Sequence, residues 1–348
     1  MRLGELSETY APYHLINTAL NIQWSDYANR RGRNADFFLF SKYWIGSQAT
    51  GYAPTEKLEP VARDLDLATA MAISGAAASS NMGTSSVRPL TPTLAILNVR
   101  LGYWLKNPAY WAPTRTGWID KPRRPAWIPK HRSSSFLWSE ITGRLHENTD
   151  EIYLTDGGHI ENLGIYELLR RRCRFIIAVD AEHDATMHFP SLVRLERYAR
   201  IDLGIRINSP WEDIRKTTLA LMSSAASTTD ASLPKPQPGP HVAIGTIDYG
   251  DGETGFLMYV KTSLTGDEND YIRDYARRYR LFPHEPTGDQ FFSEEQFEVY
   301  RALGFHMMHG ALCGSDHIEV VGASQDAIVR FDDPSIEPVC RFRTALMS

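Results

Sequence analysis

Residues 151–180 constrain the fold of this chain most, because three regular elements follow one another within them. EIYLT is a short apolar strand that ends in the turn D-G-G. Residues 159–173 then place apolar side chains on one helical face, which predicts an amphipathic helix. The segment 174–184 begins as a continuous apolar run, typical of a strand that a parallel sheet covers on both faces. This β-turn-α-β unit predicts an α/β fold of three layers (α/β/α), with helices on both faces of a largely parallel sheet.

The remaining sequence supplies further elements for this fold. Periodicity and composition predict strands at 14–24, 36–44 and 204–209, helices at 65–80, 91–105, 191–201 and from Ser293 onward, and a hairpin in which VAIGTIDY and FLMYVKTSL flank GDGETG. Residues 223–240 are low in complexity, which predicts a mobile loop. We expect one domain at 1–314, followed by a weakly patterned tail at 315–348.

Composition and charge exclude several classes of protein. The 348 residues carry a net charge of −5, which argues against a nucleic-acid binder. The three cysteines are too few and too scattered for a disulfide framework or a cysteine-based zinc site. No apolar run reaches the roughly eighteen residues of a membrane-spanning helix, and the N-terminus lacks the apolar core of a secretory signal. We expect a cytoplasmic or peripheral membrane protein, with no transmembrane segment in this chain.

Asp156 is the side chain best placed for chemistry. It lies at the carboxyl end of a predicted strand, where open α/β sheets bind their ligands. Gly157 and Gly158 allow a tight turn with positive φ that leaves the carboxylate free. Two interpretations fit these residues: the carboxylate acts as a general base toward a hydroxyl or a water, or it caps the helix that follows. The D-G-G turn alone does not separate them.

The block YLTDGGHIENLGIYELLRRRCRFIIAVDAEHD resembles the aspartate-bearing block of the patatin-like and cytosolic phospholipase A superfamily, in particular its large microbial members. Similar segments include PYHLINTALNIQ, FFLFSKYWIGSQATGY and FPHEPTGDQFFSEEQFEVYRALG, so the resemblance spans residues 12–304. It implies a patatin-like fold and a lipid acyl-ester hydrolase with a Ser–Asp dyad. It also implies that no cofactor is needed and that the substrate is a phospholipid or another acyl lipid at a membrane surface. Asp156 would activate the serine.

The sequence departs from this family at the nucleophile. Members carry their serine in a G-x-S-x-G elbow, which follows a glycine-rich oxyanion loop, and this sequence contains neither. We therefore expect the chain to be a C-terminal portion of the catalytic domain, with the serine and the oxyanion donors upstream of it.

Ser74, in A-I-S-G-A, is the nearest alternative nucleophile within the chain. Alanine replaces both outer glycines of an elbow, and a Cβ there crowds the strained turn that exposes the serine. A predicted helix also precedes Ser74, whereas an elbow follows a strand. We expect a packing role for Ser74, with the nucleophile as the alternative. His159, directly after the turn, is a candidate for substrate contact, and a surface position at the start of a helix is its other interpretation.

Two further functions stay open on the sequence. The missing elbow is typical of a catalytically inactive member, or a gene fragment, that binds lipid or a protein partner. Alternatively, Asp180, His183 and Asp184 offer oxygen and imidazole ligands after a strand, as a metal-dependent hydrolase needs. Their spacing matches no particular metal site, so we expect no metal and assign Asp180 the role of orienting loops beside Asp156.

Overall fold

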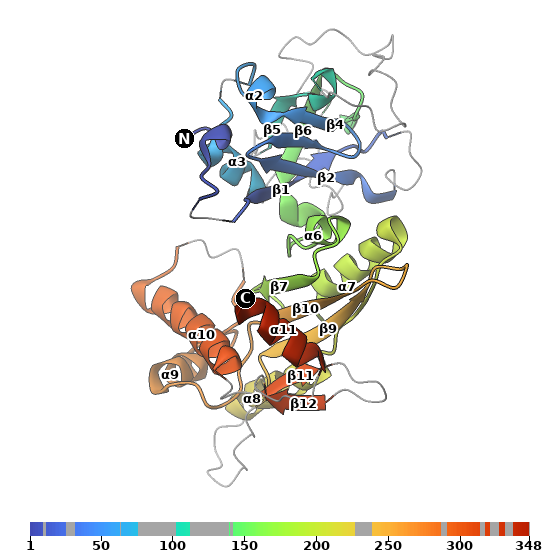
Figure 1. Ribbon diagram of the computed structural model, residues 1–348. Helices are drawn as coiled ribbons and strands as arrows, with labels where there is room; N and C mark the ends of the chain where they lie inside the picture. Colours follow the sequence, from blue (N-terminus) through green and yellow to red (C-terminus); the bar gives the residue numbers. More distant parts are fainter. Residues whose placement is uncertain are drawn as a thin grey trace. The chain divides into compact units, whose positions relative to one another are not determined.

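The chain forms two compact units, unit 1 (Met1–Asn162) and unit 2 (Leu163–Ser348), each built of helices and a β-sheet (Figure 1). The computed structural model describes residues 1–9, 12–25, 32–62, 64–75, 102–111, 139, 142–226, 239–286, 291–313, 317–320, 327–330 and 337–347. The mixed α and β class agrees with the expected one. Most of the predicted loop at 223–240 lies outside the described residues.

Unit 1 contains a six-stranded sheet in the order β4-β3-β2-β1-β6-β5. Its strands are β1 (Leu15–Asn21), β2 (Ala35–Ser41), β3 (Trp44–Ser47), β4 (Gly51–Pro54), β5 (Tyr103–Lys106) and β6 (Glu151–Asp156). Every neighbouring pair is antiparallel. The expectation of a largely parallel sheet is therefore wrong for this unit. Tight connections join β2, β3 and β4, and only antiparallel neighbours can be joined that way.

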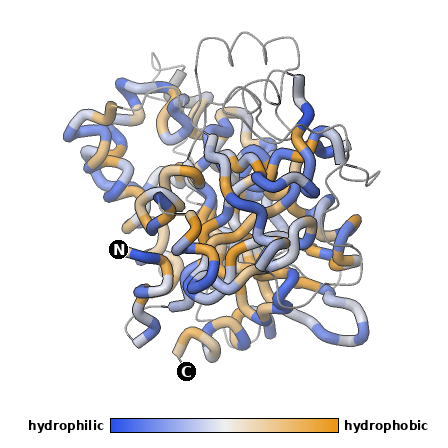
Figure 2. Tube along the Cα trace, turned by 90° about the horizontal axis from the view of Figure 1, so that it is seen from above, coloured by the Kyte–Doolittle hydropathy of each residue, from blue (hydrophilic) through white to orange (hydrophobic). Residues whose placement is uncertain are grey.

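Short helices pack on the apolar side of this sheet. They are η1 (Leu3–Glu5), α2 (Thr55–Leu58) and α3 (Leu67–Ser74), with η3 (Pro108–Tyr110) following β5. Their side chains join those of β1, β2 and β6 in one core, which includes Leu3, Leu20, Phe38, Phe40, Leu58, Ala70, Ile73 and Leu154. Hydrophobic and hydrophilic residues alternate along the trace, as expected for elements with one buried side (Figure 2).

The helix predicted at 91–105 is wrong at its described end. Tyr103–Lys106 form β5, which pairs antiparallel with β6, and residues 91–101 lie outside the described part. Tyr103 and Trp104 are aromatic residues that favour strands, and Leu105 is buried by this pairing. Apolar spacing alone did not reveal the strand, because a short apolar run fits either a helix or a buried strand.

Unit 2 contains a mixed sheet in the order β12-β11-β9-β10-β7, with β8 also paired to β9. Its strands are β7 (Phe175–Asp180), β8 (Arg206–Asn208), β9 (Val242–Asp248), β10 (Thr254–Lys261), β11 (His317–Val320) and β12 (Ala327–Arg330). The pairs β10–β7 and β11–β9 are parallel, and the others are antiparallel. The predicted hairpin of β9 and β10 is confirmed.

Helices pack on both faces of this second sheet. They are α6 (Tyr166–Arg170), α7 (Pro190–Tyr198), the π-helix η5 (Ala199–Leu203), α8 (Glu212–Ala226), α9 (Asp270–Arg278), α10 (Glu294–Leu312) and α11 (Glu337–Met347). Helices α9, α10 and α11 share one core with Met258 and Val260 of β10. Phe189, at the start of α7, covers the opposite face and contacts the ring of Tyr259. Ser293 caps α10 as predicted, accepting the Gln296 N–H at 3.1 Å.

The segment after residue 314 is part of unit 2. Val320 of β11 and the α11 residues Val339 and Phe342 are buried in the same core as β9 and β10. This segment was expected to be a separate tail, because its sequence is polar and only weakly periodic. These three apolar residues attach the segment to the core, while Leu346 and Met347 at its end are exposed.

The predicted β-turn-α-β unit is not formed, because β6 and β7 belong to different sheets. After β6 the chain makes a 3-10 turn, η4 (Gly157–His159), and the helix α6 begins only at Tyr166. Gly164 has a φ of +70°, a left-handed conformation that a continuous helix excludes. The short α6 therefore does not act as the crossover of a parallel pair, and Asp180, which was assigned the orientation of loops beside Asp156, ends a strand of the other sheet.

Candidate functional site

The Asp156 turn follows β6, which lies between β1 and the edge strand β5 in the unit 1 sheet. Asp156 pairs with Thr18 of β1, and its side chain is partly exposed. Its Oδ1 accepts a hydrogen bond from the Gly158 N–H at 2.7 Å. The carboxylate therefore caps the 3-10 turn η4 while it stays in contact with solvent, so the cap and the general base are compatible roles rather than alternatives.

Close packing and not backbone conformation explains Gly157, and a side chain at Gly158 would displace the side chain of Asn162. Neither Gly157 nor Gly158 is among the positive-φ residues, contrary to the expectation from the sequence. A Cβ on Gly157 would lie 2.7 Å from the carbonyl oxygen of Asn17 in β1. A Cβ on Gly158 would lie 2.1 Å from Oδ1 of Asn162. The turn is thus pressed onto its neighbours, which fixes the position of the Asp156 backbone.

Ser74 meets this turn through the backbone of β1. Its hydroxyl donates to the Asn17 carbonyl at 2.7 Å, the same oxygen against which Gly157 packs. Ser74 is the last residue of α3, whereas a nucleophile elbow places the serine between a strand and the helix that follows it. The structure therefore brings Ser74 near the Asp156 turn, but in a local geometry unlike that of an elbow.

His159 lies inside the turn and not on its surface. Its side chain is 8% exposed, and its Nδ1 lies 3.0 Å from the hydroxyl of Thr155. Asn21 of β1 donates to the same hydroxyl at 2.9 Å. The contacts among Asn21, Thr155 and His159 keep the imidazole buried next to the end of β6. The surface position expected from the sequence is therefore not observed.

A second polar group lies at the ends of β7 and β10 in unit 2. The Lys261 ammonium is fully buried and lies 3.1 Å from Oδ1 of Asp180 and 3.8 Å from Oδ2 of Asp184. The Tyr259 hydroxyl also donates to Asp180, and burial together with this carboxylate raises the pKa of Tyr259 far above its ordinary value. Lys261 supplies the positive charge that a metal ion would otherwise bring to these carboxylates.

The residues of the proposed metal-dependent hydrolase are held by other contacts. The Asp184 carboxylate accepts backbone N–H groups from His188 and Phe189 at 2.9 Å and 2.8 Å. His183 directs Nδ1 at the carbonyl of His284, 2.6 Å away. Among the described residues, these side chains are not gathered around a common point that could hold an ion.

A histidine and carboxylate cluster that the sequence analysis missed lies elsewhere in unit 2. His241, Asp267 and His306 bring one ligand atom each to within 4.8 Å of one another. His241 lies directly before β9, Asp267 lies after β10, and His306 lies within α10. Their separation along the chain gives no motif, so only the packing of α10 against the sheet brings them together.

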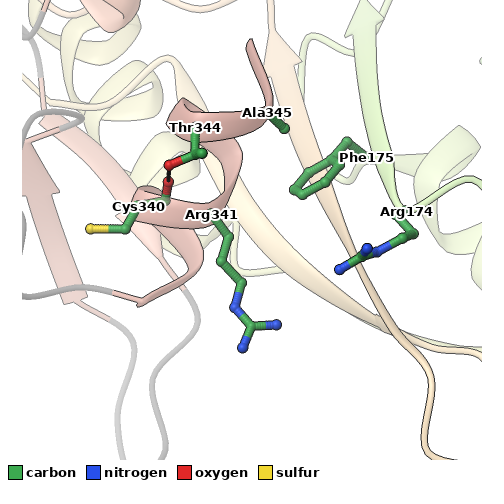
Figure 3. Close-up of a pocket in the computed structure, with 6 residues that line it drawn as sticks. All are labelled: Arg174, Phe175, Cys340, Arg341, Thr344 and Ala345. Carbon is green, nitrogen blue, oxygen red and sulfur yellow. Dashed lines mark hydrogen bonds between the residues drawn. The ribbon is translucent and has the colours of Figure 1, made fainter. Parts of the chain in front are cut away.

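A shallow pocket of about 420 Å³ lies between the start of β7 and α11. Figure 3 shows that Phe175 and the guanidinium of Arg341 line it, with Cys340 and Thr344 on α11 and Arg174 on the opposite side. Arg341 pairs with Glu337 at 2.5 Å, and its guanidinium also lies over the ring of Phe256. The described residues that line the pocket include no carboxylate or histidine suited to proton transfer, so they add a surface recess and no catalytic group.

Comparisons of the chain with known protein families, with curated proteins and with solved structures found no match. No helix in the part of the chain that the structure describes is long and apolar enough to cross a bilayer.

Proposed function

We propose that this chain provides the general base of a lipid acyl-ester hydrolase of the patatin-like class, and that Asp156 is that base. The observation that supports this proposal is the state of the carboxylate. It is partly exposed at the end of β6, and the Gly158 N–H orients one of its oxygens. Within the described ranges no lysine or arginine pairs with Asp156, so no ion pair competes for it.

The reaction needs a carboxylate in this state. A serine hydroxyl attacks the ester carbonyl carbon while its proton moves to Asp156, and the alcohol leaves with that proton to give an acyl-serine. A water then attacks the acyl-serine while Asp156 accepts a proton of that water, and Asp156 returns this proton to the serine oxygen as the acyl–oxygen bond breaks and the fatty acid is released. A carboxylate locked by a buried cation would be a poor base, because the cation favours its charged form.

Ser74 has a structural link to the turn, through Asn17. Its position at the end of α3 and the absence of a G-x-S-x-G sequence favour a serine supplied by another segment. The phospholipid substrate and the site of action at a membrane surface follow from the family resemblance and belong to the same proposal.

Fatty acid release from phosphatidylcholine vesicles tests the role of Asp156. We expect Asp156→Asn to abolish release and Asp248→Asn to leave it unchanged. Asp248 is a matched control, because its carboxylate accepts the N–H of the residue two positions on, Gly250, at 2.9 Å, as Asp156 does. Equal release by both variants would overturn the assignment.

A fluorophosphonate probe with peptide mapping identifies the serine. Labelling of Ser74 that disappears in Asp156→Asn would make this chain a self-contained hydrolase. Labelling of no serine in the folded chain would place the nucleophile in another segment.

A catalytically inactive lipid-binding protein is the second candidate. It is favoured by the hydroxyl of Ser74, which is engaged with a backbone carbonyl, and by the missing elbow. Sedimentation with phosphatidylcholine vesicles, without release of fatty acid under any condition, would establish this alternative in place of the hydrolase.

A further inference from the structure

We propose that His241, Asp267 and His306 form a binding site for a divalent transition-metal ion of the zinc type, which ties α10 to the ends of β9 and β10. The site lies entirely within unit 2 and is independent of the function proposed for Asp156. Two imidazoles and one carboxylate suit zinc better than magnesium or calcium, which prefer oxygen ligands throughout.

The distances among the three side chains fit a single ion. Nε2 of His306 lies 3.2 Å from Oδ1 of Asp267, and all three ligand atoms lie within 4.8 Å of one another. Zinc bonds to nitrogen and oxygen are about 2.0–2.2 Å long, so tetrahedral ligands are about 3.3 Å apart. The Asp267–His306 pair already has this separation, and the third ligand needs to approach by no more than a small side-chain movement.

The hydrogen bonds of His241 present its Nε2 to the site. The Ser263 hydroxyl donates its proton to the Lys261 carbonyl at 2.8 Å, so it accepts the proton on Nδ1 of His241, which lies 2.8 Å away. A neutral ring protonated on Nδ1 has a lone pair on Nε2, the form in which histidine binds metals.

The Thr265 hydroxyl has fewer protons to donate than there are acceptor atoms around it, so one lone pair is available to a cation. The Thr265 hydroxyl lies 2.9 Å from Nε2 of His241 and 2.5 Å from Oδ1 of Asp267. The hydroxyl has one proton, and the carboxylates of Asp267 and of Glu268, whose Oε1 lies 3.3 Å away, both accept from it. The Nε2 lone pair of His241 then receives no proton from Thr265, and a metal ion bound there satisfies it. The Thr265 oxygen then lies beside the ion, either as a further ligand or next to a bound water.

The loop that carries Asp267 is fixed before any ion binds. The Glu268 carboxylate is 4% exposed and accepts the N–H groups of Thr265 at 2.5 Å and Gly266 at 3.0 Å. His306 is held by the long helix α10 (Figure 1). Ligands that are positioned in advance lose little conformational entropy on binding. The Asp267 side chain is 37% exposed, so an ion can enter from solvent and keep one position open.

Metal binding by the full chain tests this site directly. After chelator treatment, calorimetric titration with Zn²⁺ is expected to show one ion per chain. Co²⁺ is expected to give the visible absorption of a four-coordinate nitrogen and oxygen site. In His306→Ala and Asp267→Asn, we expect the Zn²⁺ dissociation constant to rise by at least about 100-fold, since changes one shell further out already cost about 10–100-fold.

His309→Ala is the matched control, because His309 lies one turn along α10, is exposed and is near Cys313. It is expected to bind Zn²⁺ like the unchanged chain. Hydrogen exchange of α10 is expected to slow when Zn²⁺ is added to the unchanged chain and not when it is added to His306→Ala. No saturable binding by the folded chain, or binding that survives His306→Ala and Asp267→Asn, would overturn the proposal.

Discussion

The two units treat their carboxylates in opposite ways. In unit 1, Asp156 is partly exposed, and among the described residues it accepts a single hydrogen bond, from the Gly158 N–H. In unit 2, Asp180 is 2% exposed and is bound by the ammonium of Lys261, the hydroxyl of Tyr259 and the N–H of Glu182. The first carboxylate is held by the shape of its turn, and the second by charge and hydrogen bonds.

This contrast separates groups available for chemistry from groups that the fold needs. A buried charge without a partner is costly, so every donor around Asp180 is required for the folded state. A partly exposed carboxylate remains solvated, so neutralising it leaves no buried charge without a partner. This difference supports the proposed role of Asp156, whereas the more elaborate network of Asp180 serves the folded state.

The strongest test of the contrast is Lys261→Met, which keeps the length of the side chain and removes its charge. We expect it to lower the free energy of unfolding by about 3–5 kcal/mol, because it leaves buried carboxylates unpaired. Urea unfolding measures the loss, and hydrogen exchange assigns it to β7 and β10. Adding Asp180→Asn to Lys261→Met should restore part of the stability. A loss below about 0.5 kcal/mol, the range of ordinary surface changes, would contradict a structural role for the network.

The turn in unit 1 is expected to respond to added volume and not to lost charge. Gly157→Ala places a Cβ 2.7 Å from a backbone oxygen that cannot move without distorting β1. We expect a loss of about 1–3 kcal/mol in the free energy of unfolding, as for other overpacked sites. Gly75→Ala is the control, since its nearest neighbour would be 3.8 Å away. Equal effects of the two substitutions would show that close packing does not fix the turn.

Buried histidine makes unit 2 sensitive to acid. His284 is 1% exposed, and burial together with the nearby Lys261 lowers its pKa from 6.5 to about 4. The unfolded chain therefore binds this proton first, so the stabilising contribution of the neutral ring is lost as the pH falls from 6.5 toward 4. Between pH 6.5 and pH 5.5 the loss is about 1 kcal/mol.

Unfolding curves at the two pH values measure this contribution. In His284→Gln the pH dependence should shrink by that amount, whereas His188→Gln, at an exposed position, should leave it unchanged. An unchanged slope in His284→Gln would assign the acid sensitivity to other groups.

Local patterns predicted most single elements of this fold. Alternating and apolar runs indicated β1, β2, β6 and β7, the hairpin of β9 and β10, and the cap of α10. These elements are determined by side chains close in sequence. The pairing of the strands is not, and β7 joined β10 in a second sheet instead of joining β6. The resulting division into two units could not be predicted from residues 151–180 alone.

The sequence likewise indicated single residues of the sites, but not the distant residues that contact them. Asp156 was found because a glycine turn after a strand is a local feature. The contact of Ser74 with Asn17, the burial of Lys261 and the meeting of His241 with His306 all depend on packing between distant segments. Asp180 was noticed for its position after a strand, and only the structure shows that a lysine is already bound to it.

The smallest expected change in stability is that of Asp156→Asn, and it bears most directly on function. Asparagine can accept the Gly158 N–H with its own side-chain oxygen and caps helical turns about as well as aspartate. The free energy of unfolding should therefore change by less than about 0.5 kcal/mol, while fatty acid release is lost. A large loss of stability would make Asp156 a structural residue like Asp180, and the difference between the two units would then no longer identify the catalytic carboxylate.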